Sequence, residues 1–147
     1  MLKKSWEQFH ADAVTLADIV RTFEPDIIVP CMIGGLFPGA IIAKELGIND
    51  VRPIDIERRG EERRLAYDVQ GDIAGKRVLL VEDDLPTGKG PAMVKRMYEE
   101  RGAKVRIASV YVSEQGRHNV DYFIEIYEGE IEYPWKKWHW GDRVREP

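Results

Sequence analysis

The stretch that most restricts the fold of this chain is VLLVEDDLPTGKGP, residues 78 to 91. A short apolar run ends in three acidic residues, and a loop of small residues follows directly. Such a run is typical of a strand that is buried on both faces, as in parallel sheets covered by helices. A glycine-rich turn entering a helix is a common anion site, because backbone N–H groups and the helix dipole point at the ligand. The segment therefore predicts a strand, a loop and a helix that bind a negatively charged group.

The rest of the chain alternates between strand and helix patterns. Apolar spacing predicts a first helix over residues 5 to 23, with Ser5 and Gln8 as a capping box. Further helices are predicted at 39–47 and 91–102, and strands at 26–33, 51–56, 76–82, 104–112 and 122–128. This order predicts an α/β fold with a mostly parallel twisted sheet flanked by helices, formed by 1–147 as a single domain. The charged segment 57–75 is predicted to be a long connection or a flap.

Composition excludes several classes of function. The net charge of −4 gives no general electrostatic attraction to nucleic acid, and no apolar run reaches membrane-spanning length. Cys31 is the only cysteine, which fits a reducing compartment. His10, His118 and His139 lie far apart in the sequence without cysteine partners, which argues against a zinc site. We expect a cytoplasmic protein without a leader segment that binds neither nucleic acid nor membrane.

Two loops are expected at the ligand-binding edge of the sheet. In open α/β sheets the ligand lies outside the carboxyl ends of the strands, where the loops 33–38 and 82–90 arrive. Acids at a strand end can hold a divalent cation or accept hydrogen bonds from sugar hydroxyls, and the glycine-rich turn suits a phosphate. A nucleotide or sugar phosphate with Mg²⁺ satisfies both features.

Other interpretations of this motif fit less well. A Walker A loop needs a glycine and a hydroxyl residue where this chain has Asp83 and Gly90. The run LLVEDD also resembles the first strand of a response-regulator receiver domain, but that strand belongs near the N-terminus, and ASVYVSEQ lacks the later acceptor aspartate. An acid-rich strand end followed by an ordinary helix cap, without any chemistry, is the remaining alternative.

Three segments together resemble the type I phosphoribosyltransferases. VLLVEDDLPTGKG resembles the phosphoribosyl-pyrophosphate signature of that family, and GGLFPGAIIAKELGI resembles the pyrophosphate-loop region of its purine branch, especially the xanthine-guanine enzymes. EIEYPWKKW resembles the base-binding segment near the C-terminus of those enzymes. The segments occur in family order and at family spacing, so the resemblance spans nearly the whole chain.

The resemblance implies a role for each segment. Glu82 and Asp83 would hold the ribose hydroxyls, directly or through Mg²⁺. The other implied roles are 5′-phosphate binding by Thr87, Gly88, Lys89 and Gly90, pyrophosphate binding by Ile33, Gly34 and Gly35, base binding by Ile131, Tyr133 and Trp135, and a mobile flap formed by 57–70. Packing or a subunit contact is the alternative for Trp135 and the favoured interpretation for Trp138 and Trp140. A homodimer is expected.

Several positions with an implied binding or catalytic role depart from the family pattern. Ile33 replaces a basic residue, Pro86 an acid, Gly90 a hydroxyl residue, Ser113 a lysine, Glu130 an aromatic and Lys136 an acid. A general acid or base contributes ~10²–10⁴ in rate, so losing one slows an enzyme without abolishing it. Glu130 and Glu132 are the candidates to replace the missing acid, and Glu132 is assigned as catalytic together with Glu82 and Asp83.

The predicted function is Mg²⁺-dependent transfer of ribose 5-phosphate from phosphoribosyl pyrophosphate to a nitrogenous, purine-like base, with release of pyrophosphate. A nucleoside monophosphate would be the product. The alternative is a non-catalytic sensor of phosphoribosyl pyrophosphate or of a nucleotide that keeps the fold without the chemistry.

Overall fold

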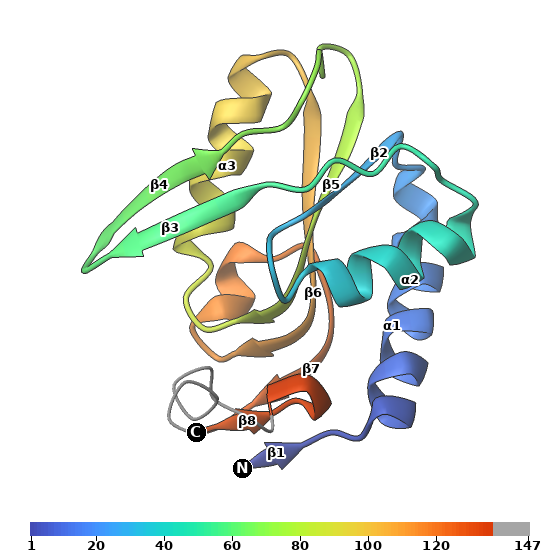
Figure 1. Ribbon diagram of the computed structural model, residues 1–147, viewed down its shortest axis with the longest axis vertical. Helices are drawn as coiled ribbons and strands as arrows, with labels where there is room; N and C mark the ends of the chain where they lie inside the picture. The colour runs from blue at the N-terminus through green and yellow to red at the C-terminus, as the bar shows by residue number, and fades with distance from the viewer. Residues whose placement is uncertain (137–147) are drawn as a thin grey trace, which may run out of the picture.

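The structure is a computed structural model, and it describes residues 1–136 (Figure 1). Its centre is a parallel sheet of four strands in the order β2–β5–β6–β7. These strands are β2 (Ile27–Pro30), β5 (Arg77–Leu85), β6 (Lys104–Ser113) and β7 (Tyr122–Tyr127). The prediction of a mostly parallel sheet flanked by helices is confirmed.

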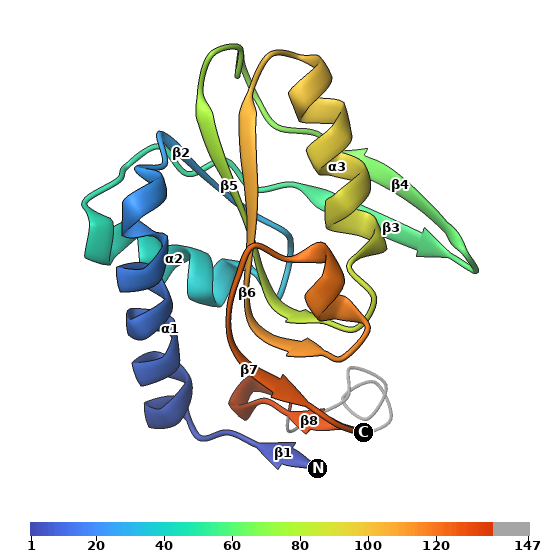
Figure 2. The ribbon, with the colours of Figure 1, turned by 180° about the vertical axis from the view of Figure 1, so that it is seen from behind.

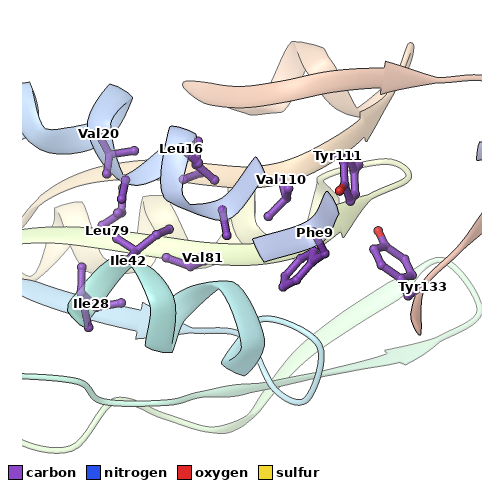
Figure 3. Packing of buried hydrophobic residues seen from close by; sticks show 14 of the residues in the cluster. Phe9, Leu16, Val20, Ile28, Ile42, Leu79, Val81, Val110, Tyr111 and Tyr133 are labelled. Carbon is purple, nitrogen blue, oxygen red and sulfur yellow. The ribbon is translucent and has the colours of Figure 1, made fainter. Parts of the chain in front are cut away.

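Helices cover both faces of this sheet. The helices α1 (Trp6–Val20) and α2 (Leu36–Leu46) pack on one face and α3 (Lys89–Glu100) packs on the other (Figures 1 and 2). The core under α1 and α2 contains Phe9, Leu16, Ile42 and Val81, which point toward one another in Figure 3. None of the helices in residues 1–136 is long and apolar enough to cross a bilayer.

The helix boundaries follow from local capping. The Ser5 hydroxyl accepts a hydrogen bond from Gln8 N, and the Gln8 side chain accepts one from Ser5 N, which confirms the predicted capping box. Helix α2 ends at Gly47, whose φ of 69° is left-handed as expected for a glycine C-cap. Short 3₁₀ turns connect other elements: η1 (Arg21–Phe23), η2 (Gly116–Asn119) and η3 (Pro134–Lys136).

Strand β5 is longer than predicted. The predicted strand ended at Glu82, with Asp83 and Asp84 in the loop, but pairing with β6 continues as far as Leu85 opposite Val112. The ladder extends because backbone hydrogen bonds do not require apolar side chains. The acids therefore lie within the strand, where the backbone holds them. Helix α3 begins at Lys89, two residues before the predicted start.

The segment predicted as a strand at 51–56 is irregular. It makes isolated bridges beside β2, at Val51 and Ile54, and Pro53 between them has no N–H to donate. The chain then forms a hairpin of β3 (Asp55–Arg59) and β4 (Glu62–Tyr67), which extends away from the sheet (Figure 1). The predicted flap therefore contains regular antiparallel structure.

A second small sheet was not predicted. β1 (Leu2–Lys3) pairs in parallel with β8 (Ile131–Glu132), near the carboxyl end of β7. With two residues in each strand, neither segment is long enough to show an alternating pattern.

Candidate active site

Three consecutive carboxylates lie at the carboxyl end of β5. Asp83 is only 6% exposed, while Glu82 and Asp84 are half-buried. The Tyr127 hydroxyl donates a hydrogen bond of 2.5 Å to the Asp84 carboxylate, and the Tyr133 hydroxyl donates one of 3.2 Å to the main-chain oxygen of Asp83. Tyr127 at the end of β7 and Tyr133 directly after β8 therefore hold the end of the acidic strand in place.

Cys31 lies beside these acids. Burial, followed by the charge and hydrogen bonding of Glu82, raises the pKa of the Cys31 thiol well above its usual value. The thiol therefore stays protonated at neutral pH, and Cys31 acts as a small packing residue and not as a nucleophile.

The loop after β2 packs closely against β5. The Met32–Ile33 peptide bond is cis. A Cβ atom on Gly34 would lie 2.3 Å from Asp83 Oδ2, and one on Gly35 would lie 2.3 Å from the main-chain oxygen of Val81. Only glycine fits at these two positions. The backbone of the predicted pyrophosphate loop is thereby brought against the acids, while the Ile33 side chain is 65% exposed.

The predicted phosphate loop caps helix α3. Gly88 is the N-cap residue with φ 75°, and the Lys89 N–H donates to the Thr87 hydroxyl at 3.3 Å. The Lys89 ammonium lies 3.0 Å from Glu61 at the tip of the hairpin, and both side chains are exposed. The loop therefore has the helix N-terminus and one cation close together, as a phosphate site requires.

Ser113 at the end of β6 and Asn119 in η2 hold this loop from the other side. The Ser113 hydroxyl donates to the main-chain oxygen of Pro86 at 2.5 Å and accepts from Gly116 N at 2.9 Å. Asn119 donates from its amide to the main-chain oxygen of Thr87 at 2.8 Å. By resemblance to the family, Ser113 occupies the position of a lysine that contacts the base, but in this structure its hydroxyl binds the loop backbone. Asn119 was missed because no local pattern connects it with Thr87.

The hairpin contacts the phosphate loop at its base. A Cβ atom on Gly90 would lie 3.2 Å from Ile56 Cγ2, so this position has little room for the hydroxyl residue that the family pattern carries. The end of the hairpin is fixed to α3, because Asp68 accepts hydrogen bonds from Tyr98 Oη at 2.8 Å and from Arg101 Nη2 at 2.7 Å. Burial acts to raise the pKa of Asp68, but the hydrogen bonds from Arg101 and Tyr98 outweigh it, and the pKa is lowered.

The predicted base-binding segment is largely packed. Tyr133 is fully buried, and Trp135 stacks on Phe37 at 4.3 Å and on Tyr133 at 4.7 Å between ring centroids. These contacts favour the packing interpretation of Trp135 and give the ring of Tyr133 no exposed surface. Ile131 is half-buried on β8, and a contact between Ile131 and a base stays a prediction. Trp138 and Trp140 lie outside the described residues.

The candidate acids of this segment are close to the N-terminus. Glu130 is exposed, and the Glu132 carboxylate lies 4.0 Å from Lys3 Nζ. Glu132 also lines an open groove of about 400 Å³ together with Lys4, Trp6 and Pro134. The role of Glu132 as a proton donor or acceptor stays a prediction.

The metal chemistry of the site follows from its donors. Among residues 1–136, no group of three or more His, Cys, Asp or Glu side chains could by itself enclose a metal ion. Mg²⁺ is usually held by one or two carboxylates together with substrate phosphates and water. The adjacent carboxylates of Glu82 and Asp83 fit that kind of site.

The chain matches a known family over almost its full length. Residues 5–146 match the phosphoribosyl transferase domain. A xanthine-guanine phosphoribosyltransferase of Ruegeria sp. (strain TM1040) is 32% identical over 138 residues, which cover 82% of this chain and 75% of that protein.

Solved structures agree with this match. The crystal structure of a purine phosphoribosyltransferase from Pyrococcus horikoshii Ot3 superposes with a TM-score of 0.86 at 28% identity, covering 94% of this chain and 95% of the other. A xanthine-guanine-hypoxanthine phosphoribosyltransferase from Helicobacter pylori shares the fold at a TM-score of 0.78 and 17% identity, over 92% and 93% of the two chains. Together with the acid pair of β5 and the two glycine loops, these matches show that the chain belongs to the type I phosphoribosyltransferase family, in its purine branch.

Proposed function

We propose that this protein transfers the 5-phosphoribosyl group of phosphoribosyl pyrophosphate to a ring nitrogen of a purine base and releases pyrophosphate. One observation carries the proposal. The Gly34 loop packs directly on Asp83, and the same strand leads within a few residues into the N-terminus of α3. Sites for a pyrophosphate, a ribose and a phosphate would therefore adjoin one another in the order in which phosphoribosyl pyrophosphate carries these groups.

The ribose and its 5′-phosphate would be bound by the β5–α3 segment. Glu82 and Asp83 would accept hydrogen bonds from the ribose hydroxyls. The backbone N–H groups of Thr87, Gly88, Lys89 and Gly90 would surround the 5′-phosphate, helped by the α3 dipole. Pro86 has no N–H, so the loop offers the phosphate one donor fewer than a non-proline residue would allow.

Pyrophosphate would lie against residues 33 to 35. Gly34 and Gly35 have no side chains and pack against β5, so the loop backbone lies beside Asp83. Glu82 and Asp83 would hold Mg²⁺, and the bound ion would offset negative charge as pyrophosphate leaves. The exposed Ile33 supplies no charge there, so the basic residues of the hairpin would have to contribute it.

The chemistry requires positioning more than covalent catalysis. Positive charge develops on the ribose as its bond to pyrophosphate breaks, and the carboxylates of Glu82 and Asp83 would stabilise that charge. Closure of 57–70 over the ligands would exclude water. Since Pro86 cannot exchange a proton, we infer that Glu132 assists the base.

The acceptor is expected to be a purine that offers N–H donors. Ser113 is uncharged and supplies no cation to a 6-oxo group, and its hydroxyl binds the main chain of Pro86. Glu130 replaces an aromatic ring. Guanine and xanthine are therefore expected to be poor acceptors, and an anionic base such as orotate is disfavoured beside Glu130 and Glu132. A cytoplasmic location and a homodimer are further expectations.

The experiment that tests the proposal is turnover of radiolabelled phosphoribosyl pyrophosphate with Mg²⁺ and a panel of purine and pyrimidine bases. We expect a nucleoside monophosphate to form with at least one purine. Binding of phosphoribosyl pyrophosphate without turnover of any base would contradict the proposal and favour the sensor. Guanine turnover as efficient as that of the best base would show that the assignment of the base site is wrong.

A further inference from the structure

The N-terminal segment is joined to the predicted base-binding segment through the backbone. Leu2 N donates to the main-chain oxygen of Glu130 at 2.9 Å, and Lys4 N donates to that of Glu132 at 3.0 Å. The two bonds flank Ile131, whose partner in the parallel pair is Leu2. The position of Ile131 therefore depends on where residues 2 to 4 are held.

Pairing alone cannot hold these residues in place. Strands of two residues each form too few hydrogen bonds to be stable in water, and isolated two-stranded sheets are marginal even when they are longer. The small sheet needs an anchor in the body of the protein, and the Lys4 side chain provides one.

Lys4 is fixed between two other elements. Its side chain is 12% exposed, and its ammonium lies 3.0 Å from Asp12 on α1 and 3.0 Å from Glu125 on β7. The ammonium also lies 5.1 Å from the centre of the Tyr111 ring, and the Tyr111 hydroxyl donates to Asp12 at 2.6 Å. Burial by itself lowers the pKa of Lys4, but the two carboxylates outweigh it and the pKa is raised, so the ammonium stays charged. A short, shielded ion pair of this kind holds a side chain far better than an exposed one.

We propose that Lys4 is a positioning residue for base recognition, which fixes residues 130 to 132 through β1 and so sets the affinity for the base. The inference rests on the proposed function, because it takes this segment to be the base site. The groups expected to bind phosphoribosyl pyrophosphate lie on β5 and its two loops, which are held by Ser113, Asn119 and Tyr127. The Tyr133 hydroxyl also reaches the main-chain oxygen of Asp83 at 3.2 Å, but its ring is fully buried and lies outside residues 130 to 132. Loss of Lys4 should therefore act on one substrate and not on the other.

The experiment compares Lys4→Met with Lys3→Met. Both variants remove one charge from adjacent residues, but Lys3 is 69% exposed and its ammonium lies 4.0 Å from Glu132. In Lys4→Met we expect kcat/KM for the purine base to fall, through a higher base KM, by about tenfold to a hundredfold, since a misplacement of about 1 Å can cost about 10²-fold. We expect KM for phosphoribosyl pyrophosphate to stay within twofold of wild type, and Lys3→Met to match wild type in both constants. Lys4→Arg, which keeps the charge, should recover most of the base affinity.

A second measurement does not depend on catalysis. Amide hydrogen exchange at residues 2 to 4 and 130 to 133 should become faster in Lys4→Met and stay unchanged in Lys3→Met, while exchange in β5 stays slow. If Lys4→Met does not fold, Glu125→Gln removes one partner of the ammonium and should change base KM and amide exchange in the same direction by a smaller amount.

Distinct outcomes overturn the inference and the proposed function. An unchanged base KM in folded Lys4→Met overturns the inference. An equal rise in KM for the base and for phosphoribosyl pyrophosphate also overturns it, because that would indicate general destabilisation. Unchanged amide exchange at residues 130 to 133 also overturns it. Wild-type protein that turns over no base at all overturns the proposed function, and the exchange experiment then still decides whether Lys4 holds the segment.

Discussion

Gly34 lies directly against the carboxyl group of Asp83, with room for no side chain between them: an added Cβ would lie 2.3 Å from Oδ2. Gly34→Ala must therefore displace the loop or the carboxylate. Overpacking of this kind costs about 1–3 kcal/mol. We expect kcat/KM for phosphoribosyl pyrophosphate to fall by about tenfold or more, since 1.4 kcal/mol corresponds to a factor of ten.

Ile33→Ala is the control for this variant. It removes an exposed side chain but keeps the main chain, through which residues 33 to 35 would bind pyrophosphate, and it adds no contact. Steady-state kinetics should show less than a twofold change for Ile33→Ala. Full activity in Gly34→Ala would mean that the loop and Asp83 need not be close during turnover.

Binding of phosphoribosyl pyrophosphate should require Mg²⁺ together with the acids of β5. In calorimetry, chelation of Mg²⁺ or the double change Glu82→Ala/Asp83→Ala should abolish measurable binding, because Glu82 and Asp83 would hold the ion and accept hydrogen bonds from the ribose hydroxyls. Asp84→Asn on the same strand should retain binding, since its side chain can still accept from Tyr127. Unchanged affinity of the double variant with Mg²⁺ present would remove these acids from the site.

The hydrogen bond from Tyr127 to Asp84 should stabilise the folded protein. Hydrogen bonds to charged groups contribute about 1.5–3 kcal/mol, so Tyr127→Phe should lower the free energy of unfolding by that amount in urea denaturation. Tyr122→Phe on the same strand is the matched control, because no hydrogen bond from its hydroxyl occurs within residues 1–136. Equal stability of the two variants would show that Asp84 is as well satisfied by water.

The anchor between Asp68 and Arg101 should make the hairpin sensitive to acid. The pKa of Asp68 is lowered from 3.8 in the folded protein, so its stabilisation is present above the pKa of the unfolded chain and is lost as pH falls through the lower folded value. The difference in unfolding free energy between wild type and Asp68→Asn should therefore be constant near neutral pH and shrink below pH ~4.

Asp18→Asn provides the comparison for this pH dependence. Asp18 also pairs with an arginine, Arg21 at 3.2 Å, but both side chains are more than half exposed. Surface pairs of this type contribute little, so its difference from wild type should stay near zero at every pH. A difference for Asp68→Asn that grows on acidification would contradict the assigned direction of the pKa.

Pro86→Asp tests whether the acid that the family pattern carries at position 86 is needed for proton transfer. The change restores an acid and one N–H donor to the phosphate loop. New or faster turnover of a purine would indicate that the acid is the missing group. If Glu132 takes its place, Glu132→Gln should lower turnover by ~10²–10⁴ while affinity for phosphoribosyl pyrophosphate stays nearly intact. If the wild-type enzyme is active and Glu132→Gln leaves its turnover unchanged, Glu132 is excluded from proton transfer.

The sequence by itself determined the elements whose causes are local. The Ser5–Gln8 capping box, the Gly47 helix end and the apolar run before Glu82 each occupy a few consecutive residues, and the structure has them where they were predicted. The parallel sheet followed from the alternation of these elements. Gly34 and Gly35 were assigned to pyrophosphate by resemblance, but the sequence did not show that they pack against β5.

Tertiary structure decided everything that depends on contacts between distant segments. Ser113 was compared with a base-reading residue, yet its hydroxyl binds Pro86, and Tyr133 was expected to line a ligand site but is fully buried. The pairing of residues 2 and 3 with 131 and 132 cannot be predicted from the sequence, because two-residue strands have no periodicity. Side-chain direction and burial are properties of the assembled sheet, and no local pattern encodes them.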